Sequence, residues 1–102
     1  MYDRLRHQIE VSGHGRKVWP SKDIGPHELL LRNFHFCTID DPSSVDAVVA
    51  LAPDKIMVET DYPHADSTWP ESQKAIEDNF KDVPAASRRR ILCDNARTLY
   101  GL

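Results

Sequence analysis

The sequence has no long hydrophobic run, and none of its apolar stretches approaches the roughly 20 residues that a membrane-spanning helix needs. The N-terminal stretch MYDRLRHQIE is charged and lacks the apolar core of a secretion signal. Cysteine is also scarce, because the chain contains only Cys37 and Cys93, far apart and without CxxC spacing. This excludes a disulfide framework. We therefore expect a soluble cytoplasmic protein without a membrane partner, in which both cysteines are reduced packing residues.

Positive charge is scarce in the middle of the chain. Residues 33–83 contain three Lys and Arg against eleven Asp and Glu. A nucleic-acid-binding protein presents a continuous basic face, so we expect no nucleic-acid partner. An acidic middle suits a cation instead, although solvated helix faces would explain most of this charge.

Several catalytic and cofactor motifs are absent. The chain has no glycine-rich dinucleotide or phosphate-binding loop, no GxSxG elbow, no HExxH zinc motif and no EF-hand loop.

Residues 1–32 show little of the periodic hydrophobic pattern that predicts helices or strands. Tyr2, Leu5 and Ile9 predict the end of a short amphipathic helix, which a break around His14 stops. We expect the rest of residues 1–32 to be loop.

From residue 33 onward the pattern becomes regular. Phe34–Ile39 is rich in aromatic and β-branched residues and predicts a strand. Asp41 precedes a helix over 42–52, and Lys55–Thr60 predicts a second buried strand. This order predicts an α/β fold with the two strands parallel. Two helical stretches follow, one opening at Trp69–Glu71 and one at Ala85–Tyr100, with a candidate break near Asp94 and a C-cap at Gly101.

The segment VETDYPHADSTWP follows the second strand and carries four side chains that bind metals or protons, namely Glu59, Asp61, His64 and Asp66. Binding sites of α/β proteins gather at the carboxyl ends of strands, which is where Asp61 lies. The period of two along a strand puts Glu59 on the same face as Asp61. Alternatively, Asp61 and Asp66 only accept hydrogen bonds from loop amides, and His64 is an ordinary exposed loop histidine. His35, between two phenylalanines, is expected to be a core histidine.

Three segments, FHFCTIDD, KIMVETDYPHADSTWP and NARTLYGL, resemble the C-terminal part of the amidohydrolase-related family (amidohydrolase family 2). These are metal-dependent TIM-barrel hydrolases, together with decarboxylases similar to aminocarboxymuconate-semialdehyde decarboxylase. The resemblance implies that Phe34–Ile39 and Lys55–Thr60 are the seventh and eighth strands of a (β/α)8 barrel. It also implies that Asp61 is a metal ligand and proton carrier, and that His64 lies near the substrate mouth. The role of Glu59 stays open, because many members carry a small residue there.

The chain departs from this family in its metal ligands. It contains no HxH or ExH motif, and a complete barrel takes about 250 residues. Catalytic zinc normally has three protein ligands and one open position. The leading hypothesis is therefore a partial domain over 1–102, comprising the last two βα units and the C-terminal helix. It would act on a small carbonyl or carboxylic-acid substrate, using a divalent metal (zinc is the expected ion), and would be inactive alone.

The alternative hypothesis is a non-catalytic α/β module or a truncated product. An open two-stranded sheet exposes strand edges, which invite pairing with another chain. Such a chain is expected either to self-associate or to be complemented by the missing portion of the barrel. The substrate, and the choice between hydrolysis and decarboxylation, stay open.

Overall fold

Two units make up the chain in the computed structural model, Met1–Phe34 and His35–Leu102. The structure describes residues 1–13 and 15–102, so His14, which we expected to interrupt the first helix, lies outside the described residues. Among the helices of the described residues, none combines the length and the apolar character needed to cross a membrane.

The first unit contains α1 (Tyr2–Glu10), a 3-10 turn η1 (Gly15–Lys17) and α2 (Pro26–Asn33). Helix α1 agrees with the amphipathic helix predicted at the N-terminus. Its contact with α2 includes the His27 ring, which is 5% exposed and meets the Tyr2 ring edge-on at 5.3 Å between centroids.

Helix α2 corrects the expectation that the rest of residues 1–32 is loop. Gly25-Pro26 is typical of a loop, but here Gly25 is the N-cap of α2 and Pro26 occupies its first turn. The Gly25 N–H donates to Glu28 Oε2 at 2.7 Å, which satisfies a backbone donor at the start of the helix. Proline suits this position because the first helical N–H groups have no partner within the helix.

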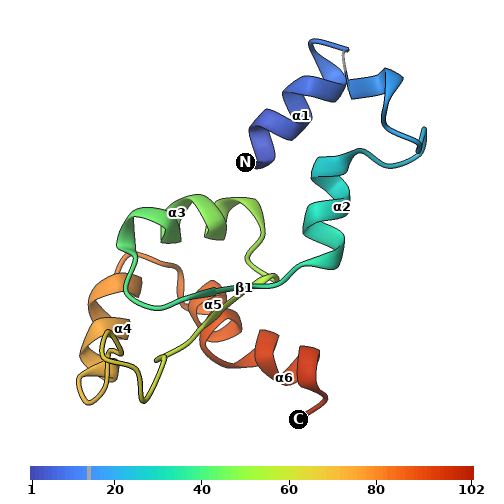
Figure 1. The fold of residues 1–102 in the computed structure, drawn as a ribbon. Coiled ribbons are helices and arrows are strands. Elements are labelled where there is room, and N and C mark those ends of the chain that lie inside the picture. Colours follow the sequence, from blue (N-terminus) through green and yellow to red (C-terminus); the bar gives the residue numbers. More distant parts are fainter. Residues whose placement is uncertain (14) are drawn as a thin grey trace. The chain divides into compact units, whose positions relative to one another are not determined.

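The second unit is built on two parallel strands, β1 (Phe36–Thr38) and β2 (Ile56–Val58), with Phe36 opposite Ile56. Helix α3 (Pro42–Leu51) connects them, and Figure 1 shows the chain returning from α3 to lie beside β1. The predicted β-α-β unit and its parallel pairing are therefore confirmed. Both strands are shorter than the predicted ranges Phe34–Ile39 and Lys55–Thr60. Only Phe36–Thr38 and Ile56–Val58 pair with each other.

The core of the second unit lies on the face of the sheet that carries Ile56. Its buried residues come from β2 and from the helices and turns around it, and they are Val45, Ile56, Phe80, Val83 and Ile91. Val58 packs against the same cluster. The side chains of Ile56 and Val58 therefore point to one face, as the period of two predicts.

Helix α4 (Ser72–Phe80) follows the loop after β2, and α5 (Ala85–Arg89), η2 (Arg90–Asp94) and α6 (Asn95–Tyr100) end the chain. Segment η2 is a π-helix, so the candidate break near Asp94 is a local widening of the helix and does not interrupt it. Gly101 is the C-cap, as predicted, with φ 71° in the left-handed region.

Candidate active site

The loop after β2 is closed on itself at its base. The backbone oxygen of Thr60 accepts a hydrogen bond from Ser67 Oγ at 2.6 Å and another from the Thr68 N–H at 3.2 Å. Ser67 Oγ in turn accepts from the Trp69 N–H at 3.1 Å. These bonds tie the two ends of the loop together, so the residues between them are presented on a fixed base at the carboxyl end of β2.

Asp61 is the first residue of this loop beyond its base, and it has an unusual backbone. Its φ of 56° lies in the left-handed region, where aspartate and asparagine are the best tolerated residues after glycine. The alternation of side chains along β2 therefore does not continue to Asp61. It no longer supports the prediction that Glu59 and Asp61 point to the same face. Non-glycine residues in this region cluster at functional sites.

The carboxylate of Asp61 is paired with His64. His64 Nδ1 lies 2.9 Å from Asp61 Oδ2, and the His64 N–H donates to the backbone oxygen of Asp61 at 2.9 Å. The side chain of Asp61 is 30% exposed and that of His64 is 71% exposed. When the imidazole is neutral and its Nδ1 carries the proton, this bond leaves Nε2 as an acceptor facing outward.

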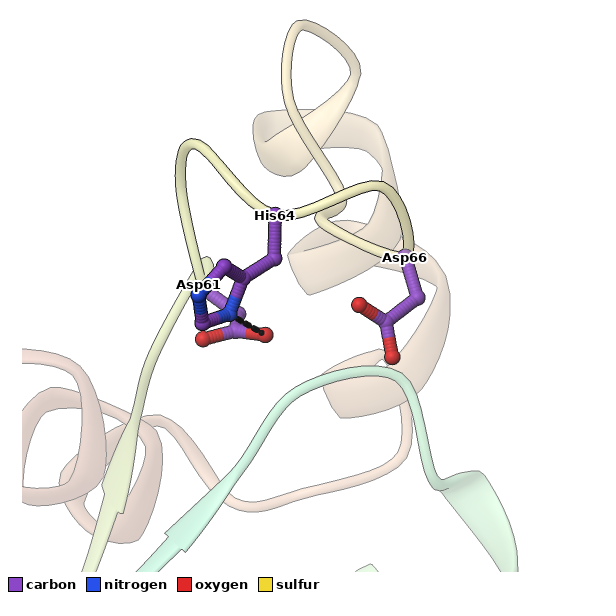
Figure 2. A group of neighbouring side chains, drawn as sticks. All are labelled: Asp61, His64 and Asp66. Atoms are coloured by element: carbon purple, nitrogen blue, oxygen red, sulfur yellow. Dashed lines mark hydrogen bonds and ion pairs between the residues drawn. The ribbon is translucent and has the colours of Figure 1, made fainter.

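Asp66 joins this pair from the far side of the loop. One donor atom from each of Asp61, His64 and Asp66 lies within 4.8 Å of the other two. Figure 2 shows the His64 ring against the Asp61 carboxylate, with the Asp66 carboxylate to one side of the pair. The structure thus brings together three of the four residues singled out from the sequence.

Glu59 is not in this group, within the part of the chain that the structure describes. It is exposed, and its N–H extends the sheet by donating to the Thr38 oxygen at 3.0 Å. Partial burial, and secondly the negative charge of Glu59, raise the pKa of the Cys37 thiol above its ordinary value. A raised pKa keeps the thiol protonated at neutral pH, which is the wrong state for a nucleophile.

Two smaller expectations can also be checked. Both cysteines are exposed, so their prediction as packing residues is wrong. Strand alternation turns Cys37 away from the core cluster, whereas its pairing partner Met57 is only 6% exposed. His35 lies before β1 and is partly buried, outside the core cluster.

The three donor side chains fit a divalent metal in their chemistry. One imidazole nitrogen and two carboxylates form a ligand set that zinc and related ions accept. Ligand atoms around a tetrahedral zinc ion are about 3.3 Å apart, since zinc bonds to N and O measure about 2.0–2.2 Å. The observed spread of up to 4.8 Å requires a small inward movement, mainly of exposed side chains.

Comparison with known proteins identifies the family. No curated protein matches the chain significantly. A family profile described as Amidohydrolase matches residues 1–102, the whole of the sequence. This agrees with the resemblance found in the DYPH segment and in the C-terminal NARTLYGL, and family membership indicates a hydrolase-type function. The chain belongs to the amidohydrolase family.

Proposed function

We propose that the chain supplies the last two βα units of a metal-dependent amidohydrolase-type enzyme that acts on a small carbonyl or carboxylic-acid substrate. The observation that supports this most strongly is the grouping of Asp61, His64 and Asp66 at the carboxyl end of β2. That end of a parallel strand is where α/β enzymes place their chemistry.

Asp61 is the central residue of this proposal. It would hold the metal together with ligands from the other strands of the barrel, and it would take a proton from the attacking water and pass it to the leaving group. A bound divalent metal would supply Lewis-acid activation, which lowers the pKa of water to about 7. In a decarboxylation the same carboxylate would instead manage the proton that replaces the lost carboxyl group.

His64 and Asp66 have supporting roles. His64 restrains the Asp61 carboxylate through Nδ1, at 2.9 Å, and presents its other nitrogen outward, where an O–H or N–H group of the substrate can donate to it. Asp66 is exposed and adds negative charge beside the pair, which favours a cation at this position.

Metal binding by the chain itself provides a direct test. Zinc chloride is titrated calorimetrically into the wild-type chain and into Asp61→Asn, with Asp54→Asn as the matched control. Asp54 is an exposed carboxylate, but it lies before β2 and outside the group. We expect weak binding that Asp61→Asn abolishes and Asp54→Asn preserves. Equal binding by all three chains would contradict the site.

The second candidate function is association with another chain, and a specific observation in the loop after β2 favours it. Tyr62 and Trp69 are 66% and 62% exposed, and their rings contact each other edge-on at 5.8 Å between centroids. Large exposed apolar groups of this kind mark surfaces that bind other chains. Sedimentation of the chain tests this: a concentration-dependent dimer that Trp69→Ser weakens would support association, and a monomer at high concentration would refute it.

A further inference from the structure

Asn95, at the start of α6, makes two long-range hydrogen bonds to the backbone around β2. Its Nδ2 donates at 2.8 Å to the backbone oxygen of Pro53 and at 2.8 Å to that of Ile56. Asn95 is 8% exposed, and both carbonyls lie about forty positions earlier in the chain. Both hydrogens of the amide group are therefore used to hold the entry of β2.

The Ile56 carbonyl lies on the strand edge opposite to β1. The Phe36 N–H donates to Lys55 O at 2.7 Å, and the Glu59 N–H donates to Thr38 O at 3.0 Å. Because backbone groups of successive residues point to opposite edges, the carbonyl of Ile56 faces the other side. Asn95 therefore satisfies a backbone carbonyl at the start of β2 on the edge that does not pair with β1.

The π-helical segment η2 ends immediately before this residue. The Asn95 N–H closes it by donating to the Arg90 oxygen, five residues back, which is the π-type bond. Ile91, four positions before Asn95, is 1% exposed and belongs to the core cluster. The helix thus presents an apolar anchor and then a polar anchor to the same strand. Single π-turns occur frequently beside functional sites.

We infer that Asn95 is a positioning residue for the candidate active site, which it serves by fixing β2 between β1 and the C-terminal helix. This inference rests on the proposed function in assigning Asp61 its role. From Ile56 the chain runs through paired residues to Glu59 and reaches Asp61 two residues later. Movement at the entry of β2 is therefore transmitted to the loop that holds the Asp61–His64 pair.

The experiment compares Asn95→Ala with Val45→Ala, a core substitution on α3 that lowers stability without touching β2's outer edge. Amide hydrogen exchange is measured at Glu59 and His64, at a temperature at which circular dichroism shows each chain folded. Loss of the Asn95 bonds is expected to speed exchange at both amides by about tenfold relative to Val45→Ala, after correction for the change in melting temperature. Equal exchange in the two variants would overturn the inference.

Asn95→Asp is the second variant, and in its ionised form it keeps the shape while removing the two donors. It is expected to speed exchange at the same amides, and wild-type rates in a folded Asn95→Asp chain would overturn the inference. Zinc titration separates this inference from the proposed function. If the wild-type chain binds no zinc, the proposed metal site fails, whereas the exchange result still decides whether Asn95 positions the loop. If zinc binds, we expect Asn95→Ala to weaken it about tenfold and Val45→Ala to leave it within about twofold.

Discussion

The Nδ1 atom of His64 lies 2.9 Å from Oδ2 of Asp61, and the backbone of the same two residues is joined by a second hydrogen bond of 2.9 Å. The pair is thus restrained at both the main chain and the side chain. A carboxylate held in this way has one oxygen engaged by the imidazole and the other open to a metal or a water molecule. The two oxygens of the Asp61 carboxylate therefore have different roles, one toward His64 and one toward the metal or water.

Asp61→Asn is expected to abolish chemistry while the fold survives. Asparagine keeps the size of the side chain and tolerates the left-handed backbone, with φ 56° at this position, but it cannot take up the proton. Built into a complete relative carrying this segment, the change is expected to lower turnover by about 10²–10⁴-fold. Turnover and bound metal are measured together. Near-normal turnover with metal bound would refute the role of Asp61.

The neighbouring substitutions in the same enzyme are expected to be milder. His64→Ala removes the group that orients Asp61 and meets the substrate, so KM is expected to rise more than kcat falls. Asp66→Ala is expected to have the smallest effect of the three, because its side chain is exposed and, among the described residues, the bonds that hold the pair join only Asp61 and His64. A larger loss from Asp66→Ala than from His64→Ala would reverse the assignment of these two residues.

The backbone of Asp61 leads to a separate prediction about stability. A β-branched residue strongly disfavours positive φ, so Asp61→Val is expected to lower the free energy of unfolding by about 1–2 kcal/mol. Asp66→Val is the matched control, because Asp66 lies in the same loop and is not among the residues with positive φ. Urea unfolding of the two variants measures the difference. Equal losses would show that backbone strain at residue 61 is not the cause.

The sequence predicted the second unit well because its elements carry strong local signals. The strand at β2, the helix α3 that begins after Asp41 and the C-cap at Gly101 all follow from patterns of a few residues. The parallel pairing followed from their order. Helix α2 was missed, because Gly25-Pro26 is typical both of a loop and of a helix start, and only the bond from Gly25 to Glu28 distinguishes them.

Three of the four side chains singled out from the sequence lie together, but the geometry of their group was not predicted. Period-two reasoning linked Asp61 to Glu59, whereas the left-handed turn at Asp61 directs the chain so that His64 and Asp66 are its neighbours. A positive φ at a non-glycine residue has no reliable sequence signal. The sequence gives no sign of the contacts of Asn95, since its partners lie about forty positions away and no local pattern reveals such a contact.

Gly25 leads to a prediction about the first unit. A Cβ atom at residue 25 would lie 2.6 Å from Cε1 and 2.8 Å from Nδ1 of the buried His27 ring. The ring is also held by Tyr2, so it has little room to move, and Gly25→Ala is expected to destabilise the contact of α1 with α2. At Gly15 the nearest atom, at 2.7 Å, is the flexible end of the Ile9 side chain. Gly15→Ala is therefore expected to be the milder change, measured by amide exchange in α1, and the reverse order would contradict this packing.

The final prediction concerns the pH dependence of Asn95→Asp. An ionised aspartate would face the carbonyl oxygens of Pro53 and Ile56 at close range, without a proton to donate and largely out of contact with water. Both effects disfavour the charged form, so the pKa of the new carboxyl group is expected to be higher in the folded chain than in the unfolded chain. The folded variant then binds more protons than the unfolded variant, and its stability relative to wild type must rise as the pH falls. In the protonated state the carboxyl O–H can restore one of the two lost bonds. Urea unfolding between about pH 4 and pH 8 gives the free energy of unfolding of wild type and variant at each pH. Groups that titrate equally in the two chains cancel when one value is subtracted from the other. If the difference in free energy of unfolding between wild type and Asn95→Asp stays constant or widens toward low pH, Asn95 does not donate to these carbonyls.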